Sequence, residues 1–121
     1  MKENLKDCLF PVLLGSNTAA HACVRHMEKH YGVGSTVLTG KRALTLRFWP
    51  EVRVLYAPPT LSDDMLLYLL QDVNAECGYR IPLLVLCDNA YRSFLSRNLS
   101  EIEARFIVRD AEGLLEGRFA P

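Results

Sequence analysis

Short apolar runs and helically spaced apolar residues follow one another along this chain, which predicts strands and helices in alternation. Strands are predicted at residues 10–14, 35–39, 52–56, 82–87 and 106–108, where the runs are short and apolar or alternating. Apolar residues three and four positions apart predict helices between Asn17 and Gly32, over residues 61–77, and from Asp88-Asn89 to Arg97. Residues 40–50 have no regular period and are predicted to be a loop, and residues 111–118 a nascent helix.

Polar residues and glycines mark the expected ends of these helices. Ser16 or Asn17 is placed to cap the first helix by accepting a hydrogen bond from one of its free N–H groups. Gly32 follows the last apolar position of that helix and suits a left-handed stop. Ser100 and Glu103 have the spacing of a capping box and predict a further short helical turn.

Alternating strands and helices predict an α/β domain with a parallel sheet covered on both faces. We therefore expect a single domain over residues 1–121 with a Rossmann-like, doubly wound sheet of about five strands. In such a sheet, ligands collect at the carboxyl ends of the strands, at the point where the strand order reverses.

The turn after the first strand is the strongest candidate for a binding site. Gly15 allows a tight turn, and the helix N-terminus behind Ser16 and Asn17 favours a carboxylate or phosphate. If the first and fourth strands are neighbours, Asp88 and Asn89 face this turn across one crevice. Asp88 suits an ammonium group. A purely structural role for Asn17 and Asp88 as helix caps is the competing interpretation.

His21 belongs to the same candidate site as Asp88, whereas His26, His30, Asp63 and Asp64 are not expected to belong to it. His21 lies in the first turn of the helix, on the expected rim of the crevice. His26 and His30 are spaced as a zinc pair, but two ligands do not make a zinc site, so we expect solvated side chains and no metal. Asp63 and Asp64 stand at a helix start, where acids complement the helix dipole.

Composition narrows the class of partner. The 121 residues contain 14 Lys plus Arg and 14 Asp plus Glu, so no net charge draws the chain to nucleic acid or to an anionic membrane. No run approaches transmembrane length, and the apolar run near the N-terminus is too short for a signal peptide. The cysteines show no CxxC spacing, and we expect Cys23, Cys77 and Cys87 to be buried free thiols in a reducing cytoplasm.

Several motifs together resemble the N-terminal domain of a known enzyme family. Pro11-Val12-Leu13-Leu14-Gly15-Ser16, the helix with Ala22-Cys23-Val24-Arg25, and His30-Tyr31-Gly32-Val33-Gly34-Ser35 come in the family's order. Cys87-Asp88-Asn89-Ala90-Tyr91 is similar to the family's C-G-D-x-Y motif without its glycine, and Phe106-Ile107-Val108 to its FIVP motif. The chain thus resembles, from Phe10 to about Phe119, the pre-ATP-grasp domain of ATP-grasp carboxylate–amine ligases of the D-aspartate ligase or carbamoyl-phosphate-synthase-like type.

This resemblance implies a substrate-side domain that is not catalytic by itself. In the family, ATP and magnesium are held by a C-terminal ATP-grasp lobe, and this sequence contains no lobe of that kind. The expected ligand of the present domain is a small carboxylate or amino acid. The expected partner is the ATP-grasp lobe, and the face that would dock it, including Leu114, Leu115 and Phe119, is expected to be apolar and prone to self-association.

Two other classes of function remain open. A free-standing Rossmann-like nucleotide-binding enzyme is one, although the turn lacks G-x-G-x-x-G and Thr39 stands near where a ribose-binding acid belongs. A receiver-like interaction module is the other. It requires an acidic cluster with a phosphorylatable Asp at a strand end, and only Asp88 has that position.

Overall fold

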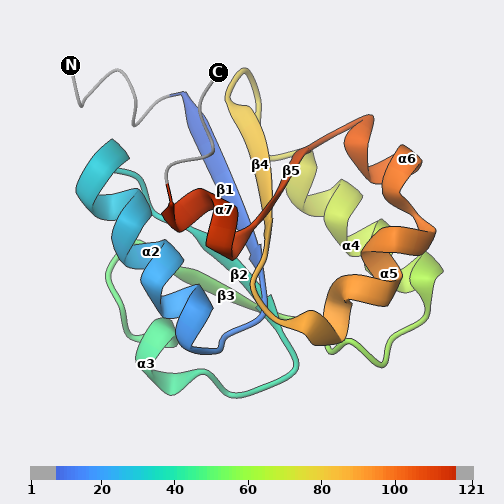
Figure 1. Cartoon of the computed structure of the whole chain (residues 1–121), viewed down its shortest axis with the longest axis horizontal. Helices are drawn as coiled ribbons and strands as arrows, with labels where there is room; N and C mark the ends of the chain where they lie inside the picture. The colour runs from blue at the N-terminus through green and yellow to red at the C-terminus, as the bar shows by residue number, and fades with distance from the viewer. Residues whose placement is uncertain (1–7, 117–121) are drawn as a thin grey trace.

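A five-stranded parallel sheet forms the centre of the domain, with strand order β3-β2-β1-β4-β5 (Figure 1). The computed structural model describes residues 8–116. This is the expected Rossmann-like architecture, and the strand order reverses between β1 and β4. The elements are β1 (Leu9–Leu14), α2 (Thr18–Tyr31), β2 (Thr36–Thr39), α3 (Leu44–Arg47), β3 (Arg53–Tyr56), α4 (Asp63–Asn74), β4 (Ile81–Leu86), the 3-10 turn η1 (Asn89–Tyr91), α5 (Arg92–Arg97), α6 (Leu99–Glu103), β5 (Ile107–Asp110) and α7 (Ala111–Leu115).

Helices cover both faces of the sheet, as expected. Helices α2, α3 and α7 lie on one face, and α4, α5 and α6 lie on the other (Figure 1). Alternate residues of β1 enter the two cores, so that Val12 packs towards α4 and Leu13 towards α2. Both residues are fully buried, which explains why β1 is apolar at every position.

Two prolines lie in the central strands without breaking the sheet. Pro11 belongs to β1, whose pairing with β2 begins only at Val12. Pro82 belongs to β4, whose pairing with β5 begins only at Leu83. Each proline therefore has a paired strand on one side only, where a missing N–H is tolerated. This stagger also leaves the beginnings of β1 and β4 projecting beyond their outer neighbours.

The helix caps follow the sequence closely at α2. Asn17 is the N-cap, and its side chain accepts a hydrogen bond from the Ala20 N–H at 3.1 Å. Gly32 ends the helix with φ 66°, and its own N–H donates to the Glu28 carbonyl at 3.0 Å. Of the two candidate cap residues, Ser16 and Asn17, the structure selects Asn17, and the expected glycine stop is confirmed.

Two local predictions are wrong. Residues 40–50, predicted to be a loop, contain the single helical turn α3, which has no side-chain cap. It forms because Leu46 is fully buried and Trp49 Nε1 donates to the Glu28 carboxylate at 2.9 Å. Ser100 does not open a capping box, because α6 already begins at Leu99 and has Asn98 at its N-cap.

The last described residues, 111–116, are less apolar at their surface than expected. Leu114 is fully buried in the core beside α2, so it cannot belong to an exposed docking face. Leu115 is 39% exposed, and Ile107 on the edge strand β5 is 37% exposed. Phe119 lies outside the described residues.

None of the described helices has the length and apolar character needed to cross a membrane.

Candidate functional site

The turns after β1 and β4 meet at the carboxyl edge of the sheet, the end at which the strands finish. β1 and β4 are paired over their whole length, from Leu9 with Ile81 to Leu14 with Leu86. Beyond the pairing, the N–H groups of Cys87 and Asp88 both donate to the Leu14 carbonyl, at 3.1 and 3.0 Å. The sequence made the shared crevice conditional on the first and fourth strands being neighbours, and the structure fulfils that condition.

Gly15 is required by this meeting of the two turns. Its φ is +115°, a region that side chains rarely tolerate. A Cβ at this position would lie 2.5 Å from the Cβ of Asp88. The space beside Gly15 is therefore filled by Asp88, and the absent side chain lets the two turns touch rather than admitting a ligand to the backbone.

Ser16 and Asn17 connect the turn to the strands on either side. The Ser16 hydroxyl is hydrogen-bonded to the Thr39 hydroxyl at the end of β2, at 2.8 Å. The Asn17 side-chain amide donates to the Cys87 carbonyl after β4, at 3.0 Å. These two side chains thus hold the carboxyl ends of β2, β1 and β4 in one fixed arrangement.

His21 and Asn89 make their contacts away from Gly15 and Asp88. His21 Nδ1 lies 3.0 Å from the Asn17 carbonyl, and its ring centroid is 6.4 Å from that of Trp49. The exposed Asn89 accepts a hydrogen bond from Arg92 Nε at 3.2 Å. The structure therefore brings Gly15, Ser16, Asn17 and Asp88 together, whereas His21 and Asn89 lie beside this group.

An open hollow of about 370 Å³ lies next to these turns at the carboxyl edge, and we call it the carboxyl-edge hollow. The carboxylate of Asp88 accepts a hydrogen bond from the Ala90 N–H at 2.9 Å and belongs to its wall. Lys41 follows β2, two residues after Thr39. It is exposed and lines the same hollow. The lining residues are Thr39, Gly40, Lys41, Pro58, Pro59, Thr60, Asp88, Ala90 and Tyr91.

Three lining residues were not predicted from the sequence pattern: Lys41, Thr60 and Tyr91. A lysine two residues after a predicted strand is a usable signal, because the carboxyl ends of parallel strands share one edge. Thr60 and Tyr91 give no comparable signal, since only the folding of the Pro58–Ser62 segment against η1 brings them to the hollow.

Tyr91 connects η1 to the segment that follows β3, and both line the hollow. Its side chain is 1% exposed, and its hydroxyl donates to the Ala57 carbonyl at 2.6 Å. Burial, together with the nearby Asp88 carboxylate, raises the pKa of Tyr91 to about 12. The phenol is therefore neutral at physiological pH and acts as a fixed hydrogen-bond donor.

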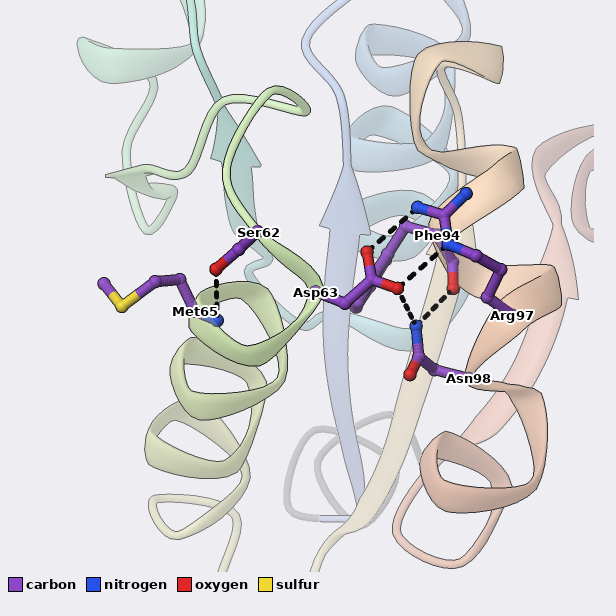
Figure 2. A network of polar contacts seen from close by, with 6 residues as sticks. All are labelled: Ser62, Asp63, Met65, Phe94, Arg97 and Asn98. Atoms are coloured by element: carbon purple, nitrogen blue, oxygen red, sulfur yellow. Dashed lines mark hydrogen bonds and ion pairs between the residues drawn. The ribbon is translucent and has the colours of Figure 1, made fainter.

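A second set of contacts fastens the start of α4 to α5 and the Asn98 turn (Figure 2). The Asp63 carboxylate accepts two hydrogen bonds from Arg97, both at 2.9 Å, and one from the Asn98 amide at 3.0 Å. Asn98 also donates to the Phe94 carbonyl at 2.9 Å. Because α4 follows Pro58–Ser62 and α5 follows Tyr91, this network holds the segments that form the outer wall of the hollow.

The Asp63 network predicts a specific loss of stability in acid. Hydrogen bonds from Arg97 and then Asn98 lower the pKa of Asp63 from 3.8 to about 2. A depressed pKa stabilises the fold above the unfolded value, and this contribution disappears as the pH falls from about 3.8 through about 2. We expect Asp63→Asn to remove this part of the acid dependence of the unfolding free energy, measured by urea titration at several pH values. Asp64→Asn, one residue away and outside the network, is the control, and an equal effect of both variants would contradict the assignment.

The thiols near the site are positioned for packing. Cys23 and Cys77 are buried free thiols, as expected, whereas Cys87 is free but only half-buried. The hydrogen bond with Cys23, together with burial, raises the pKa of the Cys87 thiol far above its usual value. Cys87 is therefore protonated and poorly nucleophilic, as the sequence interpretation of an inert thiol expects.

Among residues 8–116, no group of three or more His, Cys, Asp or Glu side chains is arranged to hold a metal ion. His26 and His30 lie with ring centroids 4.4 Å apart. Burial and the neighbouring His30 lower the pKa of His26.

The chain matches no protein-family model, no curated protein and no solved structure.

Proposed function

We propose that this domain binds a small amino-acid or carboxylate substrate in the carboxyl-edge hollow, as the substrate-side domain of an ATP-dependent carboxylate–amine ligase. The observation that carries the proposal is the presence of Lys41 and Asp88 in one hollow, beside the reversal of strand order. A free amino acid carries a carboxylate and an ammonium group. Lys41 supplies the charge for the first, and Asp88 supplies the charge for the second.

The surrounding contacts support a preformed site. Asp88 is held by the Ala90 N–H and by close contact with Gly15, and Thr39 is held by the Ser16 hydroxyl. The Lys41 N–H donates to the Thr39 hydroxyl oxygen at 3.2 Å, which fixes the backbone from which the lysine projects. The Asp88 and Thr39 side chains, held in this way, lose little conformational freedom when a ligand binds.

The ligase part of the proposal rests on the resemblance of the chain to pre-ATP-grasp domains. On this proposal, ATP and magnesium bind to an ATP-grasp lobe that is not among the described residues, and the present domain contributes no catalytic residue. Asp88 and Lys41 position the amino-acid substrate at the edge that faces the lobe.

The proposal predicts that the ammonium group of the ligand is recognised by Asp88. Aspartate and succinate have the same carbon chain and two carboxylates, and only aspartate carries an ammonium group. We expect either enantiomer of aspartate to bind more tightly than succinate, and Asp88→Asn to reduce that preference about tenfold, the usual effect of losing one charged hydrogen bond. Lys41→Met should weaken both ligands. Titration followed by amide chemical shifts measures both affinities and shows which residues respond.

Asp72→Asn is the matched control, because Asp72 is exposed on α4 and does not line the hollow. Binding of aspartate that is unchanged by Asp88→Asn, or equally weakened by Asp72→Asn, would overturn the proposed site. Shifts at Thr39, Lys41 and Tyr91 without any at Asp88 would contradict the role of the carboxylate.

The structure offers less support to the two alternatives. A Rossmann-like nucleotide site brings the pyrophosphate close to the glycine turn, but here Asp88 fills the space beside Gly15. A receiver-like module requires a cluster of acids around its phosphorylated Asp. Within the described part of the chain, Asp88 belongs to no group of three or more potential metal ligands.

A further inference from the structure

A second hollow lies at the amino edge of the sheet, where the strands begin, and we call it the amino-edge hollow. Its volume is about 310 Å³. It exists because Leu9–Pro11 precede the point at which β1 pairs with β2. The residues that line it are Leu9, Phe10, Pro11, Val33, Gly34, Ser35, Thr36, Glu51, Arg53 and Arg80.

Arg80 is held rigidly at this hollow. Its Nε donates to the Cys77 carbonyl at 3.0 Å and its Nη2 to the Glu76 carbonyl at 2.8 Å. The guanidinium carbon also lies 4.7 Å from the centroid of the Phe10 ring. These partners orient the guanidinium, but two backbone carbonyls and an aromatic ring carry no formal charge to neutralise it.

Arg53 brings a second guanidinium to the same hollow. Its Nη1 donates to the Glu76 carboxylate at 2.6 Å. That contact fixes the side chain through one nitrogen and leaves the Nε and Nη2 edge out of the ion pair. This edge has the geometry that binds carboxylates and phosphates through two parallel hydrogen bonds.

Ser35 adds a buried group without a partner. The residue is 4% exposed and lines the hollow, and its hydroxyl oxygen makes no hydrogen bond with any described residue. A buried hydroxyl in this state is uncommon in folded proteins, and a bound group or an ordered water is one explanation for it. An oxygen of a bound anion, or a water held by it, would supply that partner.

The part of the hollow formed by Gly34 and Glu51 is closely packed. A Cβ on Gly34 would overlap the carbonyl oxygen of Glu51, which itself has φ 65°. Glu51 is exposed and brings one carboxylate to the rim. This negative charge repels an anion and lowers its affinity. Removing the charge should therefore strengthen anion binding, whereas removing an arginine should weaken it.

We propose that the amino-edge hollow binds a small oxyanion, held between Arg53 and Arg80 with Ser35 beside them. The bound group is a phosphate or a carboxylate. Both present a pair of negatively charged oxygens, which a guanidinium binds through two hydrogen bonds. The site lies at the opposite edge of the sheet from the carboxyl-edge hollow. The two hollows share no lining residue, so this proposal can be tested independently of the proposed amino-acid site.

The test uses inorganic phosphate and malonate as separate probes, with binding followed by amide chemical shifts. We expect saturable shifts at Gly34, Ser35 and Arg80 with at least one probe, and the tighter of the two identifies the class of anion. Arg80→Met should weaken binding about tenfold, as the loss of a charged hydrogen bond does. Ser35→Ala should weaken it less, and Glu51→Gln should strengthen it.

Arg105→Met is the matched control, because Arg105 is an exposed arginine just before β5, at the same edge of the sheet, and does not line this hollow. Asp88→Asn should leave phosphate binding unchanged, which separates this site from the proposed amino-acid site. Non-saturable shifts with both probes, or equal weakening by Arg80→Met and Arg105→Met, would overturn the proposal. Amide spectra of each variant without ligand establish that it is folded.

Discussion

Gly15→Ala is expected to destabilise the domain by roughly 3–5 kcal/mol, the sum of backbone strain and overpacking. The added Cβ would meet the Asp88 Cβ at 2.5 Å, at a backbone φ of +115°. Neither turn can move away easily, because the Leu14 carbonyl holds both the Cys87 and Asp88 N–H groups. Urea unfolding at neutral pH measures the change in unfolding free energy.

Two other glycines provide matched controls for this prediction. Gly32 also has a positive φ, 66°, but no atom lies within 4 Å of a Cβ placed there. Gly32→Ala should therefore show only the left-handed backbone penalty, about 1–2 kcal/mol. Gly113 lies in α7 with open space around it, and Gly113→Ala should be neutral or stabilising. Equal losses at Gly15 and Gly32 would show that the contact with Asp88 has no energetic importance.

Tyr91→Ala is expected to cost about 3–5 kcal/mol, the usual range for removing a large buried aromatic side chain. Tyr91→Phe keeps the ring and removes only the hydroxyl that binds the Ala57 carbonyl at 2.6 Å. The carbonyl is then buried without its donor, which costs about 1–3 kcal/mol. Tyr79, 86% exposed, supplies the control Tyr79→Phe, which should leave the unfolding free energy unchanged.

Alkaline pH gives a second measurement on Tyr91. Its folded pKa of about 12 lies above the ordinary value of 10. The stabilisation from the neutral phenol is therefore complete below about pH 10 and is lost as the pH rises through about 12. We expect the stability difference between the native protein and Tyr91→Phe to shrink across this interval. A constant difference would contradict the raised pKa of the buried phenol.

Part of the candidate site can be predicted from local sequence patterns. Gly15, Asn17 and Asp88 stand out in the sequence because strand ends, glycine turns and cap residues have short-range signatures. The continuous apolar run at β4 also predicted a strand buried on both faces. The pairing of β1 with β4 was only a condition of the predicted site, and the tertiary structure established it. Lys41 and Tyr91 have no such signature, and they reach the hollow only through the path of the β2–α3 and β4–α5 connections.

The amino-acid sequence by itself determined the order and type of the main elements, the two-sided burial of the sheet and the caps of α2. These depend on residues near one another in the chain, on periodicity and on backbone preference. The tertiary structure alone decided α3, the start of α6, and the burial of Leu114. Leu46 and Trp49 find their partners on distant elements, and the Asn98 side chain binds Asp63 across 35 positions of the chain. It also decided that the space beside Gly15 belongs to Asp88, because that contact joins two strand ends more than seventy residues apart.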